Sequence, residues 1–301
     1  MNNLLGLGIE FDPHGEIEQR VACPQCAKNP RDRTLGINIE DGRYHCFRCE
    51  WKGRASADIY APRLRSLPPR IARIDDPAVA KRKRERLRQT WNESVLLGDS
   101  KARAVRSYLE SRALGDVLNR PPTVLRAHPG LGYWDGAAQL GTYPAMIALF
   151  HDASGHPVTL HVTYLRGDGC AKASVPNPKK ILGVPVAGST KGGSIRLYDP
   201  SDGVLGVAEG IESALSLHLL QHVPTWASFC ADNLTRAELP VGLRKLYIGV
   251  DIDTSGKGEQ VARALAVRVS KWSSGPKVLL VKPEGPAPRD LNDELRQGGA
   301  R

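Results

Sequence analysis

Four of the six cysteines stand in two pairs that have the spacing of a metal site. Cys23 and Cys26 enclose two residues, Cys46 and Cys49 enclose two more, and nineteen residues separate the pairs. Two thiolates from each tight turn close a tetrahedron around Zn²⁺, and four thiolates leave no open coordination position for a reaction. The sequence therefore predicts a structural zinc site, which replaces the hydrophobic core that so small a module cannot build.

The residues around the second cysteine pair are aromatic and basic. Tyr44, Phe47 and Trp51 either stack on unpaired bases or fill the small interior of the module. His45 is expected at the surface or in packing contacts, because four thiolates need no fifth ligand. We expect Arg48 and Trp51 to contact nucleic acid. The basic side chains that favour such a partner are Arg31, Arg33, Arg43, Arg48, Lys52 and Arg54.

Acidic residues end two apolar runs further along the chain. Glu209 closes the run 203–210, GVLGVAEG, and Asp251 and Asp253 close the run 246–253, LYIGVDID. In an open parallel sheet, ligands bind at the carboxyl ends of the strands, and alternation along a strand puts both aspartates on one side. Clustered carboxylates need a cation, and Mg²⁺ takes carboxylates, keeps several waters and bridges to phosphate. The alternative is that these acids cap the helices that follow them.

A second acidic cluster, Asp290-Leu-Asn-Asp293-Glu294, follows the last expected strand and is predicted to reach the same pocket. Glu212 lies one helical turn after Glu209 and is expected on the helix surface, with a supporting position behind the metal ligands as the alternative. The predicted catalytic carboxylates are Glu209, Asp251 and Asp253, and the predicted Mg²⁺ ligands are these three together with Asp290 and Asp293. The predicted contacts to nucleotide or template, with plain solvation as the alternative, are Lys172, Lys179, Lys180 and Lys257.

Two kinds of sheet are needed to position these groups. The segments 142–152, 156–166 and 192–199 are rich in β-branched and aromatic residues and are separated by turn signals, which is typical of an antiparallel sheet. Helices are expected before them, from Ala78 onward and over residues 101–114. After residue 203 strands alternate with helices, which predicts a parallel, doubly wound sheet. Its expected strands are 203–210, 225–229, 245–253 and 277–283, and its expected helices are 211–220 and 258–272.

The excess of positive charge is concentrated in one segment. The net charge is +10, and residues 61–90 hold ten Lys or Arg against three acids. Such a cluster favours a polyanionic partner, because each neutralised phosphate releases counterions. The alternative is a solvated linker, since prolines 62, 68, 69 and 77 interrupt any helix there. No apolar run reaches the roughly 20 residues that span a bilayer, and the N-terminus is not a secretory signal, so we expect a cytoplasmic protein without a membrane partner.

Several of these motifs resemble one family. The segments 207–215, VAEGIESAL, and 250–256, VDIDTSG, resemble the two Toprim motifs of topoisomerases and bacterial-type primases. The run 289–293, RDLND, is similar to the closing motif of phage and plasmid primases in that superfamily. The run 46–53, CFRCEWKG, resembles the zinc-binding domain of primases and primase-helicases. Further segments that resemble the core of this group are 107–112, 143–146 and 163–166, the last followed by Lys172 and Ala173.

The resemblance implies a DNA primase of the phage or plasmid type in a bacterial cytoplasm. Such an enzyme makes short RNA primers from ribonucleoside triphosphates on a single-stranded DNA template, with Mg²⁺, or Mn²⁺, as the catalytic metal. In the family, Glu209 would be the acid–base or metal-binding carboxylate. Primase-helicases of this kind carry a motor domain after Toprim, but this sequence has no GxxxxGK[ST] phosphate loop, so a separate replicative helicase is expected as a partner.

Together these observations predict an α+β multidomain chain. A zinc-ribbon DNA-binding domain is expected over 1–56, a basic linker and helix over 57–95, the N-terminal lobe of a primase core with an antiparallel sheet over 96–202, and an α/β Toprim domain with a mainly parallel sheet over 203–301. The competing functions are a Toprim nuclease, a topoisomerase fragment, and a non-catalytic adaptor that binds single-stranded DNA. A topoisomerase needs a nucleophilic tyrosine on a large additional domain, for which 301 residues leave no room.

Overall fold

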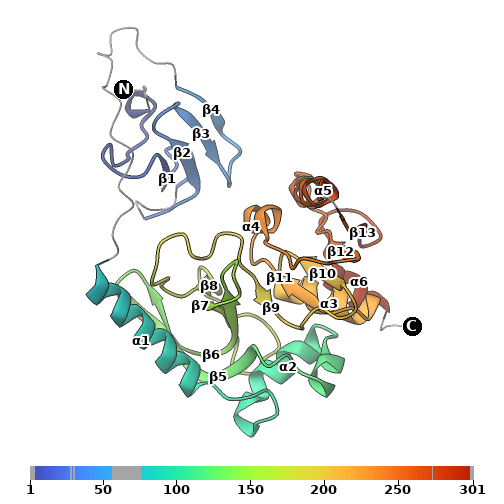
Figure 1. The fold of residues 1–301 in the computed structure, drawn as a ribbon. Coiled ribbons are helices and arrows are strands. Elements are labelled where there is room, and N and C mark those ends of the chain that lie inside the picture. The colour runs from blue at the N-terminus through green and yellow to red at the C-terminus, as the bar shows by residue number, and fades with distance from the viewer. Residues whose placement is uncertain (1–3, 28, 30, 56–75, 273, 299–301) are drawn as a thin grey trace. The chain divides into compact units, whose positions relative to one another are not determined.

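The computed structural model describes residues 4–27, 29, 31–55, 76–272 and 274–298. The chain is α+β and separates into two compact units, Met1–Ala72 and Arg73–Arg301 (Figure 1). The expected linker with its prolines at 62, 68 and 69 lies outside the described residues. Among the helices that are described, none is long and apolar enough to cross a bilayer.

The first unit is a small antiparallel sheet. Its strands β1 (Glu18–Val21), β2 (Leu35–Asn38), β3 (Arg43–Cys46) and β4 (Lys52–Arg54) are hydrogen-bonded in sequence order, after a short 3-10 helix η1 (Leu5–Leu7). Its apolar core is correspondingly small. The buried residues of this core include two of the cysteines and are Leu4, Ile9, Val21, Cys23, Leu35, Ile37, Cys46 and Ala55.

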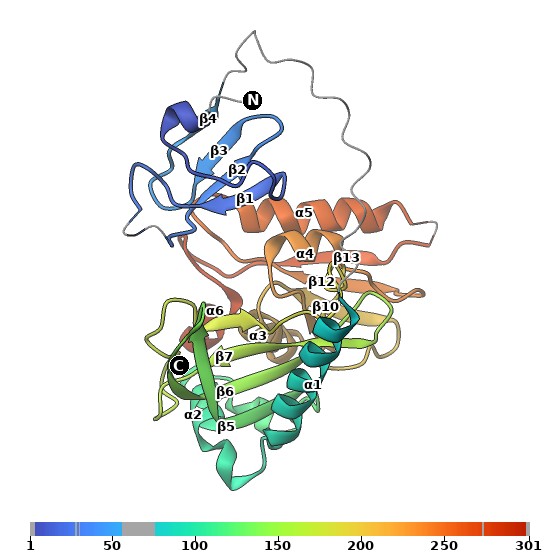
Figure 2. The same cartoon turned by 90° about the vertical axis from the view of Figure 1, so that its left-hand side faces the viewer.

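The second unit begins with an antiparallel sheet between two helices. The strands β5 (Leu125–Asp135), β6 (Ala138–His151), β7 (Pro157–Tyr164) and β8 (Lys179–Ile181) pair in sequence order. Alternation along β6 sends every second side chain to the same face. One face packs against α2 (Arg103–Ser111) and the other against α1 (Pro77–Glu93), and Figure 2 shows the two helices on opposite sides of the sheet. The short 3-10 helices η2 (Ser100–Ala102) and η3 (Gly115–Asn119) flank α2.

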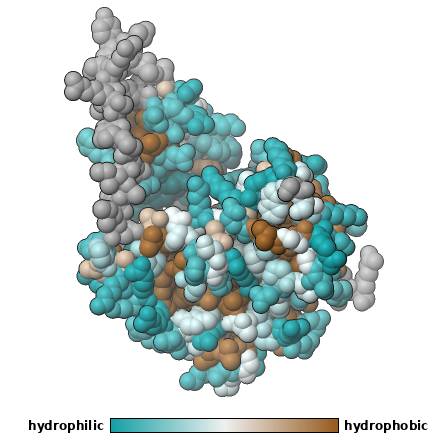
Figure 3. Space-filling model, viewed as in Figure 1, coloured by the Kyte–Doolittle hydropathy of each residue, from teal (hydrophilic) through white to brown (hydrophobic). Residues whose placement is uncertain are grey.

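Helix α1 carries much of the basic cluster. Asp76 caps its first turn by accepting from the Ala78 N–H, and Pro77 stands at a position where no backbone N–H is required. Leu87 and Trp91 pack on the sheet as expected. Most of the remaining side chains are exposed and charged, and Figure 3 shows a hydrophilic surface over this helix.

The second sheet of this unit is mainly parallel. Strands β13 (Lys277–Val281), β12 (Lys245–Gly249), β10 (Val204–Ala208) and β11 (Thr225–Ala227) are parallel neighbours in that order, and β9 (Ile195–Arg196) adds an antiparallel edge. Helices α4 (Ala231–Arg236) and α5 (Lys257–Ser270) cover one face, and α3 (Ile211–Gln221) and α6 (Leu291–Gly298) cover the other (Figure 1, Figure 2). The predicted doubly wound, mainly parallel sheet is confirmed.

Three details differ from the sequence-based expectation. The run 192–199 was expected in the antiparallel sheet, but only Ile195–Arg196 is a strand, and it pairs with β11 of the other sheet. Strand β5 was not predicted, because Pro129, Gly130 and Gly132 interrupt its pattern; a register shift between His128 and Leu131 accommodates them. Helices α4 and α6 were also missed, since each is too short for a helical apolar pattern to emerge.

Candidate active site and metal centre

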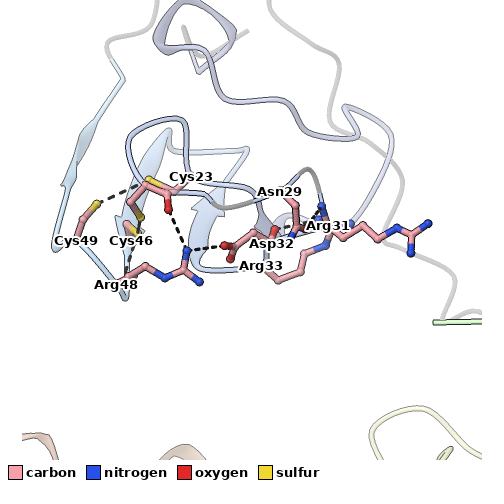
Figure 4. Close-up of polar contacts among 9 residues, drawn as sticks. Cys23, Asn29, Arg31, Asp32, Arg33, Cys46, Arg48 and Cys49 are labelled. Atoms are coloured by element: carbon pink, nitrogen blue, oxygen red, sulfur yellow. Dashed lines mark hydrogen bonds and ion pairs between the residues drawn. The ribbon is translucent and has the colours of Figure 1, made fainter. Parts of the chain in front are cut away.

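The four paired cysteines converge in the first unit. One Sγ atom from each of them lies within 4.8 Å of every other. The Cys23 and Cys49 Sγ atoms are 3.9 Å apart and those of Cys26 and Cys46 are 3.5 Å apart. A Zn²⁺ ion with bonds of about 2.3 Å to a tetrahedron of thiolates requires sulfur separations of about 3.8 Å. The cluster therefore fits zinc without rearrangement, and Figure 4 shows three of these side chains turned toward one another.

Backbone and side-chain donors support this cluster. Although burial acts to raise it, backbone N–H groups of Cys49 and Arg48 lower the pKa of Cys46 to about 6, which favours the thiolate that binds metal. The Arg48 guanidinium donates to the Cys26 carbonyl at 3.0 Å and to Asp32 at 2.5 Å (Figure 4). Arg48, predicted to contact nucleic acid, thus braces one cysteine turn against the other.

The aromatic side chains of the first unit divide between its interior and its surface. Tyr44 and Trp51 pack against the small core with ring centroids 4.5 Å apart. Phe47 is 52% exposed, and the Arg20 guanidinium lies 3.9 Å from its ring centroid. His45 Nε2 contacts Glu50 at 3.1 Å and is not part of the thiolate cluster. The structure thus places Tyr44 and Trp51 against the interior, as one alternative expected, and leaves Phe47 exposed beside Arg20; stacking on unpaired bases stays a prediction.

The carboxyl ends of β10 and β12 bring Glu209 and Asp251 together in the second unit. These strands are parallel neighbours, with Val207 opposite Ile248, so the acids that follow them lie at one edge of the sheet. Asp251 accepts a hydrogen bond from the Ser213 hydroxyl at 3.1 Å. Burial and the nearby carboxylates of Glu209 and Asp290 raise the pKa of Asp251 to about 7, and burial also raises the pKa of Glu209. This uncompensated negative charge is what a bound cation would neutralise.

Asp253 has a different role in the structure. Its Oδ1 accepts from the backbone N–H and the hydroxyl of Ser255, and its Oδ2 accepts from the Gly258 N–H at 2.7 Å. The Ser255 hydroxyl, followed by these backbone donors, lowers the pKa of Asp253 to about 2. Asp253 therefore caps the start of α5, which is the alternative that the sequence left open for strand-end acids.

Asp290 and Asp293 also cap a helix. The backbone N–H of Asp293 donates to Asp290 Oδ1 at 2.9 Å, and the N–H of Asp290 donates to Asp293 Oδ2 at 3.2 Å, at the start of α6. Reciprocal backbone bonds of 2.7 Å between Ile252 and Arg289 carry this segment alongside the end of β12. The expected neighbourhood is therefore real, but no three carboxylates of the described chain bring one oxygen each within 4.8 Å of one another.

The donor set nevertheless fits Mg²⁺. This ion keeps several waters and is usually held by one or two carboxylates together with substrate phosphates, so it does not require a cage of five protein oxygens. Glu209 and Asp251 follow the ends of the neighbouring strands β10 and β12. Asp251 accepts from the Ser213 hydroxyl, and Glu209 accepts from the Ala231 N–H at the start of α4. They are the best placed ligands, with Asp290 adjacent to them.

Glu212 corrects the sequence-based expectation. It was expected on the surface of its helix, but it is only 4% exposed. Its Oε1 accepts from the Tyr108 hydroxyl at 2.7 Å and lies 3.4 Å from Lys172 Nζ, and its Oε2 accepts from Lys179 Nζ at 3.0 Å. These cations, ahead of the Tyr108 hydroxyl, overcome the effect of burial and hold the pKa of Glu212 far below its usual range.

The four predicted lysine contacts lie in different surroundings. Lys172 and Lys179 share Glu212, yet their side chains remain 34% and 39% exposed, so each can reach a ligand as well. Lys180 Nζ lies 3.8 Å from the centroid of the Tyr133 ring and donates to a carbonyl of the β5–β6 hairpin. Lys257 Nζ lies 3.5 Å from Asp232 and lowers the pKa of Glu209. The structure therefore brings Lys172 and Lys179 together and leaves Lys180 apart from that pair.

Sequence reasoning did not identify Ser213, Tyr108 or His161 as site residues. Ser213 and Tyr108 contact Asp251 and Glu212 directly, and His161 is buried where Lys179, Glu212 and Lys172 influence its pKa. Tyr108 lies within the helix expected over residues 101–114, but a helical pattern does not show that its hydroxyl meets a carboxylate 104 residues away.

Comparison with known families divides the second unit in two. A model described as a domain of unknown function (DUF7146) matches residues 81–192, and a Toprim domain model matches residues 204–301. The Toprim match contains all five predicted Mg²⁺ ligands. No curated protein matches the chain.

Three of the solved structures that match the chain are fragments or domains of primases. The primase fragment of the bacteriophage T7 primase-helicase is 15% identical, with 93% of this chain and 95% of that chain covered and a TM-score of 0.39. The zinc-binding and RNA polymerase domains of the Aquifex aeolicus primase are 15% identical, with 99% and 80% covered and a TM-score of 0.41. The E. coli primase catalytic core is 14% identical, with 73% and 75% covered and a TM-score of 0.40.

Proposed function

We propose that this chain is a DNA primase, which joins ribonucleotides into a short RNA primer on a single-stranded DNA template. One observation carries the proposal: Glu209 and Asp251 lie at the carboxyl ends of neighbouring parallel strands, within the segment that matches a Toprim domain. A Toprim site alone also suits a nuclease. The zinc-type cysteine cluster and the basic helix α1 favour the primase, because both suit a protein that holds a nucleic-acid template.

The proposed reaction is attack of a ribose 3′-hydroxyl on the α-phosphate of a nucleoside triphosphate, with pyrophosphate as the leaving group. Asp251 and Glu209 would hold Mg²⁺, or Mn²⁺, with Asp290 beside them. When bound, the metal neutralises charge on the triphosphate and on the phosphate under attack. Glu209 is also the candidate acid–base group, since burial raises the pKa of its carboxyl.

The lysines complete the proposed site. Glu212 fixes Lys172 and Lys179, and the pair carries one more positive charge than the carboxylate between them. Lysine ammonium groups bind phosphate as point charges. They would orient the triphosphate, while Lys257, with its side chain 54% exposed, would contact phosphate near Glu209.

The finer assignments belong to the same proposal. Residues 1–56 would be the zinc ribbon that contacts template, 57–95 a basic linker and helix, 96–202 the N-terminal lobe of the primase core, and 203–301 the Toprim catalytic domain. The protein would be of the phage or plasmid type and would work with a separate replicative helicase. Two family matches support the division at residue 202: the first ends at residue 192, and the second begins at residue 204.

The direct test is to incubate the full chain with single-stranded DNA, labelled ribonucleoside triphosphates and Mg²⁺ or Mn²⁺. Short labelled RNA is the expected product, it should require DNA, and the Asp251→Asn variant should not make it. Cut DNA without RNA would establish the Toprim nuclease instead. Tight DNA binding with neither product, under both metals, would establish the non-catalytic adaptor.

A further inference from the structure

Phe229 is an exposed aromatic residue at the edge of the sheet that carries the acids. It follows β11, and its side chain is 38% exposed although Ala227 and Ser228 before it are buried. Its backbone N–H donates to the Glu209 carbonyl at 2.7 Å. This bond between backbone atoms places Phe229 beside Glu209, which follows β10 and is one of the two best placed metal ligands.

The backbone at this position favours glycine over phenylalanine. The φ angle of Phe229 is +71°, in the left-handed region that bulky side chains rarely adopt. Residues held in such conformations cluster at functional sites, where the surrounding structure over-determines them. Ring contacts with Phe150 and His161 leave Phe229 38% exposed, so part of the side chain stays open to a ligand.

Two rings of the antiparallel sheet set the orientation of Phe229. The Phe150 centroid lies 6.1 Å away at an interplanar angle of 87°, and the His161 centroid lies 6.3 Å away at 60°. Both are edge-to-face or tilted arrangements that fix a ring without stacking on it. His161 is 5% exposed, and within the described chain its buried Nδ1 has no hydrogen-bond partner.

The charged groups around this ring suit a phosphate. In the β7–β8 register His161 pairs with Ile181, and Lys179 stands two residues before Ile181, so Lys179 and His161 lie on the same face of the antiparallel sheet. Lys179 from the antiparallel sheet, the candidate metal ligand Glu209 and the exposed Phe229 ring together suit the phosphates and the base of a nucleotide. A single exposed ring among charged groups is too small an apolar area for a protein partner.

We propose that Phe229 is the stacking platform for the base of the nucleotide whose phosphates lie at Glu209 and Asp251. The identification of that nucleotide as the incoming ribonucleotide rests on the proposed function. Stacking on one ring tolerates all four bases, because every base has a π face, and this suits a polymerase whose base choice is made by the template.

The test compares ligands with and without a base. Dissociation constants of Mg²⁺·ATP and Mg²⁺·tripolyphosphate are measured for the full-length wild type and for Phe229→Ala, Phe229→Leu and Phe229→Trp. The alanine and leucine variants should bind ATP roughly five- to a hundredfold more weakly, the range that one base–aromatic stack supplies. Tripolyphosphate binding should stay within about twofold of wild type, and the tryptophan variant should keep ATP affinity.

A glycine variant separates binding from folding. Phe229→Gly relieves the left-handed strain, so it should unfold at a temperature at least as high as Phe229→Ala while losing ATP binding equally. If the ring were merely structural, ATP affinity would follow stability across the series. Should the alanine variant fail to fold, the leucine and tryptophan pair decides, because both retain a large apolar side chain.

The outcomes distinguish this inference from the proposed function. ATP and tripolyphosphate weakening together, or neither changing in the alanine and leucine variants, would overturn the platform. Primer synthesis by Phe229→Ala with an unchanged KM for nucleotide would overturn it while the primase stands. A wild type that makes no primer but binds ATP through Phe229 would overturn the primase and keep the platform. A larger loss in single-stranded DNA affinity than in ATP affinity would assign the ring to the template, against the proposal.

Discussion

Lys179 Nζ lies 3.0 Å from Glu212 Oε2, which joins strand β8 of the antiparallel sheet to helix α3 beside the parallel sheet. Glu212 is buried, whereas Lys179 keeps 39% of its side chain exposed. The Glu212 carboxylate thus holds both Lys179 and Lys172 near the acids of the candidate site. This buried charge therefore adds an ionic link to the apolar core that the two sheets share.

Replacing that charge should destabilise the second unit. Breaking a buried ion pair by removing one partner costs about 3–5 kcal/mol, but the lysines are more than one-third exposed, so we expect Glu212→Gln to cost roughly 1–3 kcal/mol. Urea unfolding at pH 7 measures this free energy. Glu110→Gln is the matched control, because the same change at an exposed carboxylate should stay within about 0.5 kcal/mol of wild type.

The same variant should alter the pH dependence of stability. The pKa of Glu212 in the folded chain lies below its ordinary value of 4.5, so its contribution is present above pH 4.5 and is lost as pH falls below it. The difference in unfolding free energy between wild type and Glu212→Gln should therefore become smaller as the pH is lowered from about 6 to about 3, the range over which unfolding is measured. A gap that stays constant over this range would contradict the ion-pair assignment.

Asp251→Asn tests the acidic site. The substitution keeps size and hydrogen bonding with Ser213 but removes an anionic metal ligand. Primer synthesis should fall at least about a hundredfold, taking the loss of one transition-state charge contact as roughly 3 kcal/mol. Binding to single-stranded DNA should change little, since the first unit and α1 are expected to supply it. Wild-type synthesis rates in this variant would move catalysis elsewhere in the chain.

Cys46→Ser tests the metal centre of the first unit. Removing one thiolate should release zinc and unfold the small sheet, because metal-binding free energy at such a site is folding free energy. The second unit has separate apolar cores and should remain folded. Cys170→Ser is the control, as Cys170 is exposed and outside the cluster. A full equivalent of zinc in the Cys46 variant, by metal analysis, would show that the four-cysteine assignment is wrong.

Charge reversal on α1 tests the DNA-binding surface. Lys81, Arg82 and Arg84 are exposed, whereas Lys83 Nζ donates to the Val184 carbonyl at 2.9 Å and belongs to the fold. Changing the three exposed residues to glutamate should weaken DNA binding across sequences and reduce the log–log salt slope by about 2–3. The control is the same reversal at three exposed lysines beyond α1, Lys191, Lys271 and Lys277. An equal slope in both triple variants would mean that α1 makes no phosphate contacts.

The sequence alone determined the elements whose signals are local. Spacing predicted that the four cysteines form one metal site, and they converge. The change from β-branched segments to alternating strands and helices predicted the two kinds of sheet, and strand-end position placed Glu209 and Asp251 at one edge. These conclusions hold because thiolate geometry, hydrophobic periodicity and parallel-strand topology each follow from nearby residues.

Tertiary structure decided how the charged groups divide their roles. Asp253, Asp290 and Asp293 have the residue type of a metal ligand, yet their oxygens satisfy backbone N–H groups at helix starts. Glu212 resembled a surface residue until the antiparallel sheet delivered Lys172 and Lys179 to it. Whether a carboxylate caps a helix, pairs with lysine or awaits a metal depends on which donors reach it, and these donors come from segments up to 104 residues away. Sequence spacing does not show which of these donors reaches a carboxylate, because the packing of the two sheets decides it.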